Sequence, residues 1–139
     1  ASPIVNIFRG GQYETNDESE GVTVTRLDVG QYLIEGCKAL NSDAAWGGID
    51  GGFEIPTEKY KQPLIWLDYE VNSDGSVLVK TYHRAHPSAP AFARTERAGL
   101  ADGDPVDIPA DQFISVRVEM PVDSLFNQKM MPASLDGGV

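Results

Sequence analysis

A β-hairpin in the middle of the chain constrains the fold more than any other feature. Residues 64–71 (LIWLDYEV) and 76–83 (SVLVKTYH) have the alternating, β-branched and aromatic composition that is typical of strands. Between them, Asp74 and Gly75 supply the positive φ angles that a tight turn needs. The sequence therefore predicts an antiparallel hairpin over residues 64–83.

The two faces of the first hairpin strand differ in polarity. Alternation places Ile65, Leu67, Tyr69 and Val71 on one face. The opposite face grades from apolar to acidic, through Leu64, Trp66, Asp68 and Glu70. A strand that is apolar on both faces at one end is usually covered on both sides there, and partner subunits are one way to provide that cover.

Shorter strand-like runs surround this hairpin. They occupy residues 4–8, 22–29, 31–35 and 112–120, and Gly30 makes a tight connection between the second and third of them. Prolines at positions 87, 90, 105 and 109 predict a loop over residues 86–109. Because 14 glycines and 9 prolines are scattered along the chain and no helix signal exceeds two turns, we expect an all-β, compact, antiparallel, sandwich-like domain.

Composition also suggests a division of the chain. Residues 14–20 are acidic and contain no apolar side chain, which is typical of a solvated loop or linker. We therefore expect residues 1–20 to form an N-terminal strand and an acidic linker, and residues 21–123 to form the β-rich domain. Residues 124–139 are expected to be an irregular tail or a linker to further chain.

Charge argues against two classes of partner. The formal net charge of −10 repels phosphate backbones and anionic membranes, so we expect no nucleic-acid binding. The start of the chain lacks the basic and apolar stretches of a secretory signal, and no apolar segment approaches the ~18 residues of a membrane span. We therefore expect no membrane insertion.

The single cysteine, Cys37, excludes an intrachain disulfide and is expected to be a small buried apolar residue.

The polar candidates for chemistry have weak patterns. Asp68 and Glu70 lie two residues apart on one strand face, as a pair for glycoside hydrolysis would, but solvated or cation-binding acids are the commoner outcome. The acids at positions 102, 104 and 107 depart from the calcium-loop spacing, although a loosely bound hard cation stays open. His83 and His86 lack the further ligands of a zinc site. We expect no catalytic residue, cofactor or metal.

Aromatic side chains are the stronger candidates for binding. Trp46, Trp66, Tyr69, Tyr82 and Phe92 suit the core, a subunit interface or a platform for a saccharide or a protein loop. Trp46 precedes the glycine-rich residues 47–52, whose backbone can approach a neighbouring molecule closely. The candidate receptor or interface contacts are Trp46, Ile49, Asp50, Trp66 and Tyr82.

Several stretches resemble a known family. They are residues 24–32 (VTRLDVGQY), 46–52 (WGGIDGG), 61–66 (KQPLIW) and 80–84 (KTYHR). Residues 21–121 resemble a segment near the distal parts of tail fibres and tailspikes of lambdoid phages and prophages, which in some of these proteins lies beside collagen-like regions. The resemblance implies a virion fibre domain, made in the bacterial host cytoplasm, with neighbouring fibre domains as partners and no transferable catalytic motif.

This resemblance favours a homotrimer, intertwined or side by side, that attaches the fibre to a host surface protein or glycan. Around a threefold axis, heterologous contacts close into a ring, and their burial must outweigh the repulsion between three acidic chains. Two alternatives remain open: a glycan-degrading tailspike fragment that uses paired carboxylates, and an intramolecular folding aid for a neighbouring repetitive region.

Overall fold

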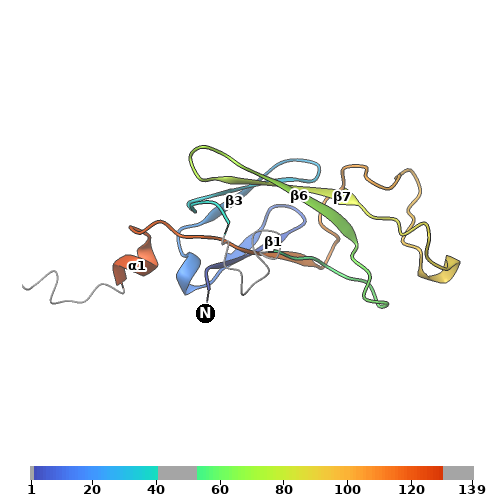
Figure 1. The fold of residues 1–139 in the computed structure, drawn as a ribbon, viewed down its shortest axis with the longest axis horizontal. Helices are drawn as coiled ribbons and strands as arrows, with labels where there is room; N and C mark the ends of the chain where they lie inside the picture. Colours follow the sequence, from blue (N-terminus) through green and yellow to red (C-terminus); the bar gives the residue numbers. More distant parts are fainter. Residues whose placement is uncertain (1, 41–52, 130–139) are drawn as a thin grey trace, which may run out of the picture.

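The computed structural model describes residues 2–40 and 53–129, whose strands form two four-stranded antiparallel sheets (Figure 1). The first sheet has the strand order β2-β1-β8-β5. Its strands are β1 (Ile4–Phe8), β2 (Tyr13–Thr15), β5 (Phe53–Glu54) and β8 (Phe113–Arg117). Strands β1 and β8 come from opposite ends of the chain, so the first sheet brings the two ends together.

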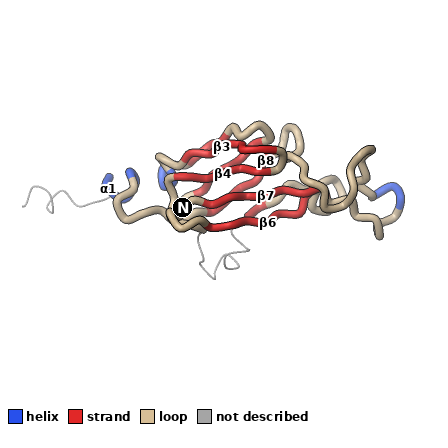
Figure 2. Tube along the Cα trace, turned by 90° about the horizontal axis from the view of Figure 1, so that it is seen from above, coloured by secondary structure: helices blue, strands red, loops and turns tan. Residues whose placement is uncertain are grey.

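The second sheet has the strand order β3-β4-β7-β6, and Figure 2 shows these four strands side by side. Its strands are β3 (Thr23–Asp28), β4 (Gln31–Glu35), β6 (Ile65–Val71) and β7 (Val77–His83). The predicted all-β, antiparallel, sandwich-like fold is confirmed. Assembly into a trimer stays a prediction.

One hydrophobic core joins the two sheets. Val5, Ile7 and Ile114 of the first sheet are fully buried in one cluster with Ile34 and Val79 of the second. The buried positions alternate along β1 and β7, as a sheet with one face on a core requires. The first sheet therefore packs face to face on the second, and each sheet keeps one outer face.

The central hairpin forms as the sequence predicts. Strands β6 and β7 pair from Ile65 opposite His83 to Val71 opposite Val77. Gly75 has a φ of +89°, and its N–H donates to the Asn72 carbonyl oxygen over 2.9 Å. Asp74 Oδ1 accepts the Ser76 N–H at 2.9 Å, so the turn is closed by its own side chain as well as by its backbone.

The connection between β3 and β4 depends on a glycine. Gly30 has a φ of +67°, and a Cβ built there would lie 2.5 Å from the Thr81 carbonyl oxygen and 2.9 Å from that of Val106. The Gly30 carbonyl oxygen in turn accepts the Thr81 N–H at 2.8 Å. Only glycine permits this close approach of the β3–β4 turn to β7.

The acidic stretch at residues 14–20 has more structure than its composition suggests. It contributes to β2 and forms a 3-10 turn, η1 (Asp17–Ser19). A capping box links Asn16 and Ser19, and the fully buried Ser19 hydroxyl donates to the Ile4 carbonyl oxygen at 2.6 Å. These bonds fix the stretch to β1, which itself pairs with β8.

Loops between β5 and β6 and between β7 and β8 extend from one end of the sandwich. We call residues 57–63 and 84–104 the projecting end; they include the 3-10 turn η4 (Ala91–Ala93). Figure 1 shows η4 at the opposite end of the molecule from α1 (Leu125–Lys129), a short helix within the expected irregular tail. No helix among the described residues is both long and apolar enough to cross a membrane.

Candidate attachment surface

An exposed tryptophan lies where the second sheet meets the projecting end. Trp66 is on the outer face of β6 and is 43% exposed. The Arg84 guanidinium carbon lies 3.8 Å from the centre of its ring, a cation–π contact. The indole Nε1–H donates to Asp102 Oδ1 at 3.1 Å. The ring is therefore held in a fixed orientation while much of it stays in contact with solvent.

The Asp102 carboxylate links the Trp66 side chain to the backbone of the projecting end. Its Oδ1 also accepts the Ala85 N–H at 2.9 Å. The backbone hydrogen bond from Ala85, followed by the side-chain bond from Trp66, lowers the pKa of Asp102 below its usual value. The group is ionised at neutral pH, so a negative charge and the positive charge of Arg84 lie on either side of the indole.

A shallow depression opens beside Trp66. Its volume is about 350 Å³, close to the lower limit of about 300 Å³ for ligand pockets. Its lining combines amide, guanidinium, imidazole, hydroxyl and carboxylate groups around one indole ring. The residues are Gln62, Trp66, Arg84, His86, Pro87, Ser88, Ala89 and Asp102. Such a lining can donate and accept hydrogen bonds and can stack on a ring.

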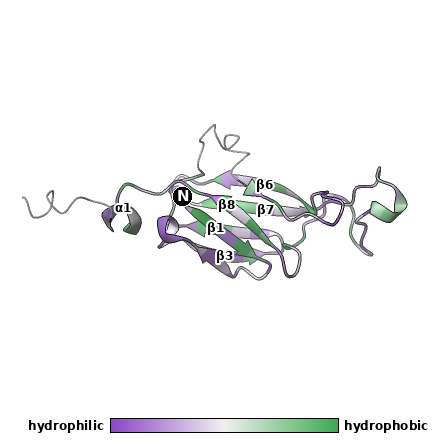
Figure 3. Ribbon diagram, turned by 90° about the horizontal axis from the view of Figure 1, so that it is seen from below, coloured by the Kyte–Doolittle hydropathy of each residue, from purple (hydrophilic) through white to green (hydrophobic). Residues whose placement is uncertain are grey.

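A second aromatic feature lies further out. Phe92 of η4 is 73% exposed, and its ring meets that of Tyr60 edge-on with 5.7 Å between centroids. Lys59 Nζ lies 5.0 Å from the centre of the Tyr60 ring. Figure 3 shows the hydrophobic colour of η4 at the extremity of the molecule. Two apolar rings and a cation are thus presented together at the projecting end.

Hydrogen bonds brace the two segments of the projecting end against each other. Gln62 Nε2 donates to the Ala93 carbonyl oxygen at 2.7 Å, and His86 Nε2 lies 2.6 Å from that of Pro63. Within the longer segment, the Thr95 N–H donates to the Ala85 carbonyl oxygen at 3.0 Å. Hydrogen bonds therefore hold the two segments of this surface together.

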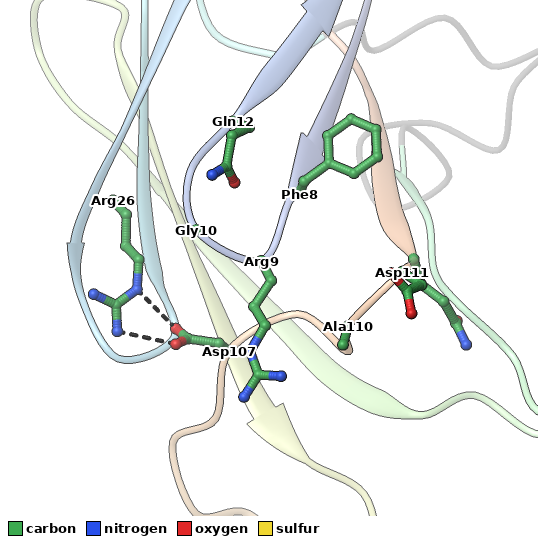
Figure 4. Close-up of a pocket in the computed structure, with 9 residues that line it drawn as sticks. Phe8, Arg9, Gly10, Gln12, Arg26, Asp107, Ala110 and Asp111 are labelled. Atoms are coloured by element: carbon green, nitrogen blue, oxygen red, sulfur yellow. Dashed lines mark hydrogen bonds and ion pairs between the residues drawn. The ribbon is translucent and has the colours of Figure 1, made fainter.

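A larger depression, of about 710 Å³, lies between the β1–β2 turn, β3 and residues 107–112 (Figure 4). Arg26 and Asp107 form its charged wall through a two-bond ion pair of 2.9 and 3.1 Å. Asp107 Oδ1 also accepts the Gly30 N–H at 2.8 Å. Burial acts to raise the pKa of Asp107, but the bonds from Arg26 and Gly30 outweigh it and lower that pKa.

Tyr32 connects this wall to the core. Its hydroxyl donates to the Arg9 carbonyl oxygen at 2.7 Å and accepts the Ile108 N–H at 3.1 Å. Burial, with the nearby Asp107 charge, raises the pKa of Tyr32 to about 12. Tyr32 thus closes one end of the sandwich by joining β4 to the β1–β2 turn and to residue 108. We assign this network a structural role.

The five contacts predicted from the sequence divide into two groups. Trp66 and Tyr82 are cross-strand partners on the outer face of the second sheet, so the structure brings them together. Trp46, Ile49 and Asp50 lie outside the described residues.

The acids that were considered for chemistry do not gather at one place. Asp68 and Glu70 are exposed on β6, and Glu70 Oε1 lies 2.7 Å from Lys80 Nζ in an ion pair. Asp102 and Asp107 bind different partners, Trp66 and Arg26 respectively. The described residues contain no group of three or more histidine, cysteine or acidic side chains that could hold a metal ion.

The histidines and the cysteine have separate environments. His83 is buried at the end of β7, whereas His86 contacts the Pro63 carbonyl oxygen in the projecting end. Cys37 is buried, as predicted, and burial raises the pKa of its thiol to about 11. The thiol is therefore protonated at neutral pH, which makes it a poor nucleophile.

Sequence reasoning missed the contribution of Tyr60 and Arg84 to this surface. Arg84 follows β7 directly, and Tyr60 stands between two lysines in a turn. Phe92 was one of several aromatic candidates, and its position in a proline-rich loop was the available signal for exposure. Nothing in the local pattern indicated that residues 60 and 92, far apart in sequence, would touch.

The fold and this surface define a β-sandwich domain with a preorganised aromatic end suited to binding. Residues 1–122 match the family model described as phage tail protein C-terminal domain, and the chain belongs to this family. The chain is 61% identical over 130 residues to a protein of Escherichia phage T1 named "Probable tail fiber protein". The matched part is 94% of this chain but 18% of that relative. No solved structure matches. The resemblance to tail-fibre proteins is confirmed.

Proposed function

We propose that this chain is the host-attachment domain of a phage tail fibre, and that the projecting end is its contact surface. The observation that carries the proposal is that Trp66, Tyr60 and Phe92 are exposed on or beside the projecting end, whose turn η4 lies at the end of the molecule opposite α1 (Figure 1). Strand β1 begins on the α1 side of the molecule, so preceding fibre domains would join away from the projecting end. The domain would act in the virion, joined to other tail components.

Binding to cells tests the attachment role. The relative from Escherichia phage T1 suggests Escherichia coli cells susceptible to that phage as the probe. We expect the labelled domain to bind these cells and to compete with phage adsorption. Trp66→Ala should weaken binding by about tenfold or more, since a central aromatic residue typically contributes at least 1.4 kcal/mol. Leu27→Ala, at an exposed position on β3, the edge strand of the second sheet opposite β6, is the matched control.

Absence of saturable binding by the unmodified domain to susceptible cells would contradict the proposal. Equal loss of binding in the Trp66 and Leu27 variants would also contradict the assignment of the surface.

We further propose that the domain is a homotrimer in which the outer face of the first sheet faces a second copy. Phe8 and Phe113 are opposite each other on this face, with ring centroids 5.4 Å apart, and Phe113 is exposed. Ile4 and Asn6 continue the face along β1. Packing of these rings against another chain would bury apolar surface at about 25 cal/mol per Å² and so oppose the charge repulsion between subunits.

Sedimentation equilibrium at micromolar concentration tests the assembly. We expect three times the chain mass of 15.1 kDa. Phe113→Glu should give monomers by placing a charge in the contact, whereas Leu27→Glu on the other sheet should leave the trimer intact. A stable monomer in the unmodified protein would contradict the trimer without affecting the attachment role.

We propose that attachment involves no catalysis by this domain. Glycoside hydrolysis needs two carboxyl groups on either side of a bound sugar, one of them protonated. Asp68 and Glu70 instead share an open strand face, where Glu70 pairs with Lys80. The test is the release of reducing sugar from host polysaccharide. Release by the unmodified domain, together with its loss in Asp68→Ala/Glu70→Ala, would contradict the absence of catalysis.

A further inference from the structure

The charges of this chain are unevenly distributed. The projecting end, residues 57–63 and 84–104, contains five of the eleven basic residues and four of the 21 acidic ones. The rest of the chain therefore has six basic and 17 acidic residues. The projecting end therefore has a formal charge of +1, and the remainder of the chain has −11.

Three of the four acids in the projecting end accept hydrogen bonds from the protein's own backbone. Glu58 Oε1 accepts the N–H groups of Tyr60 and Gln62 at 2.9 Å each. Asp102 accepts the Ala85 N–H, and Asp104 accepts the Ala101 N–H at 2.8 Å. These three acids therefore act as local turn and loop acceptors, whereas the fourth, Glu96, is exposed.

The basic residues accompany the exposed aromatic pair. Lys59 and Lys61 are exposed on either side of Tyr60, and Arg94 is exposed two residues after Phe92. Lys59 Nζ is over the Tyr60 ring. Aromatic and arginine side chains are enriched at protein interfaces, and such anchors ringed by polar groups are the usual hot spots.

We infer that the projecting end docks on an acidic protein surface, with Phe92 and Tyr60 as the apolar anchor and Lys59, Lys61 and Arg94 as the cationic rim. The inference rests on the proposed attachment role and adds the chemical class of the partner. An acidic partner repels the acidic sandwich and attracts the projecting end, so the domain approaches with this end first.

The test uses outer-membrane vesicles from Escherichia coli susceptible to phage T1, immobilised on a sensor surface. Matched surfaces carry protease-treated vesicles and purified lipopolysaccharide from the same strain. The full chain is applied at several salt concentrations, and association and dissociation rates are recorded. We expect binding to untreated vesicles, with an association rate that falls as salt rises, and little binding to the other two surfaces.

Two variants separate the rim from the anchor. Lys59→Gln/Lys61→Gln should lower the association rate several-fold at low salt and flatten its salt dependence, because rim charges act on encounter. Phe92→Ala should raise the dissociation rate by about tenfold or more, because a buried anchor acts on the lifetime of the complex. Arg9→Gln/Lys38→Gln makes the same change in net charge outside the projecting end and is expected to leave both rates near those of the unmodified chain.

The outcomes distinguish this inference from the proposed function. If the unmodified chain binds none of the three surfaces, the attachment role itself fails. If it binds equally well after protease treatment, or binds purified lipopolysaccharide as strongly, the partner is a glycan and the inference is wrong while attachment stands. Equal effects of Lys59→Gln/Lys61→Gln and Arg9→Gln/Lys38→Gln on the association rate would also overturn the inference, because the effect of charge would then not depend on its position.

Discussion

The sandwich and the projecting end use aromatic side chains in opposite ways. In the sandwich, Tyr32 is fully buried and its hydroxyl bonds to the Arg9 backbone and to Ile108. Phe92 in the projecting end and Trp66 on β6 beside it keep 73% and 43% of their surfaces exposed, although residues of the projecting end contact both rings. The rings of the sandwich therefore stabilise the fold, whereas those of the projecting end add little to it and are available to a partner.

The charged groups differ in the same way. Arg26 and Asp107 satisfy each other through two hydrogen bonds at the edge of the sandwich. Arg84 instead lies over the Trp66 ring, where its guanidinium can still reach a ligand. We therefore propose that stability and binding are assigned to different ends of the domain, and four substitutions test that separation.

Ile114→Ala should have the largest effect on stability. Ile114 is fully buried on β8 at the centre of the first sheet. Removing its side chain leaves a cavity between the sheets and should lower the free energy of unfolding by about 2–5 kcal/mol. Denaturant unfolding followed by tryptophan fluorescence measures it. A loss below about 0.5 kcal/mol would show that the core is not shared between the sheets in the way described.

Gly30→Ala should have the next largest effect. The left-handed backbone and the 2.5 Å approach of a Cβ to the Thr81 carbonyl oxygen both oppose a side chain there. We expect a loss of about 1–3 kcal/mol in the free energy of unfolding. Gly99→Ala is the matched control, because Gly99 also has a positive φ but nothing lies within 4 Å of its added Cβ. Equal losses in both variants would attribute the effect to backbone strain alone.

Asp107→Asn should have a smaller effect, and one that depends on pH. The folded pKa of Asp107 is lowered, so its carboxylate stabilises the fold above the unfolded value of about 3.9. That stabilisation is lost as the pH falls through the folded pKa. At neutral pH we expect a loss of about 1 kcal/mol for this partly exposed group. Urea unfolding at pH 7 and pH 3 should show a difference between the variant and the parent that shrinks in acid.

Phe92→Ala should have the smallest effect on stability, within about 0.5 kcal/mol, because the side chain is largely exposed. The same substitution is expected to shorten the lifetime of the complex with vesicles. If Phe92→Ala binds vesicles poorly but unfolds at the same midpoint temperature as the parent, the separation of the two ends is confirmed. A clear drop in stability would instead make Phe92 part of the folded core of the projecting end.

Much of the secondary structure was predictable because its causes are local. The runs at residues 4–8 and 31–35 became β1 and β4 with the expected bounds, and the Asp74 and Gly75 turn closed the central hairpin. The burial of Ile114 and Val116 followed from alternation along β8. Of the candidate contacts, Trp66 lies on the face of β6 that alternation predicted, and it is paired there with Tyr82 of β7.

The acidic stretch at residues 14–20 shows where composition misleads. Its polarity indicated a solvated linker, whereas Asn16 and Ser19 cap a 3-10 turn and bond to Ile4. A polar segment is ordered when its side chains satisfy backbone groups that the core would otherwise leave unpaired. The Asn16-x-x-Ser19 spacing was the local signal for this outcome.

The sequence by itself determined the six longer strands, the turn of the central hairpin, the inward faces and the excess of acid, but not the short strands β2 and β5. Only the tertiary structure decided that β1 pairs with β8 across more than 100 residues, and that Tyr60 meets Phe92 at the projecting end. Alternation and turn chemistry act between near neighbours and are legible in a short window of sequence. Strand partners and the exposure of a ring depend on which distant surfaces exclude water together, and this is a property of the whole packed chain.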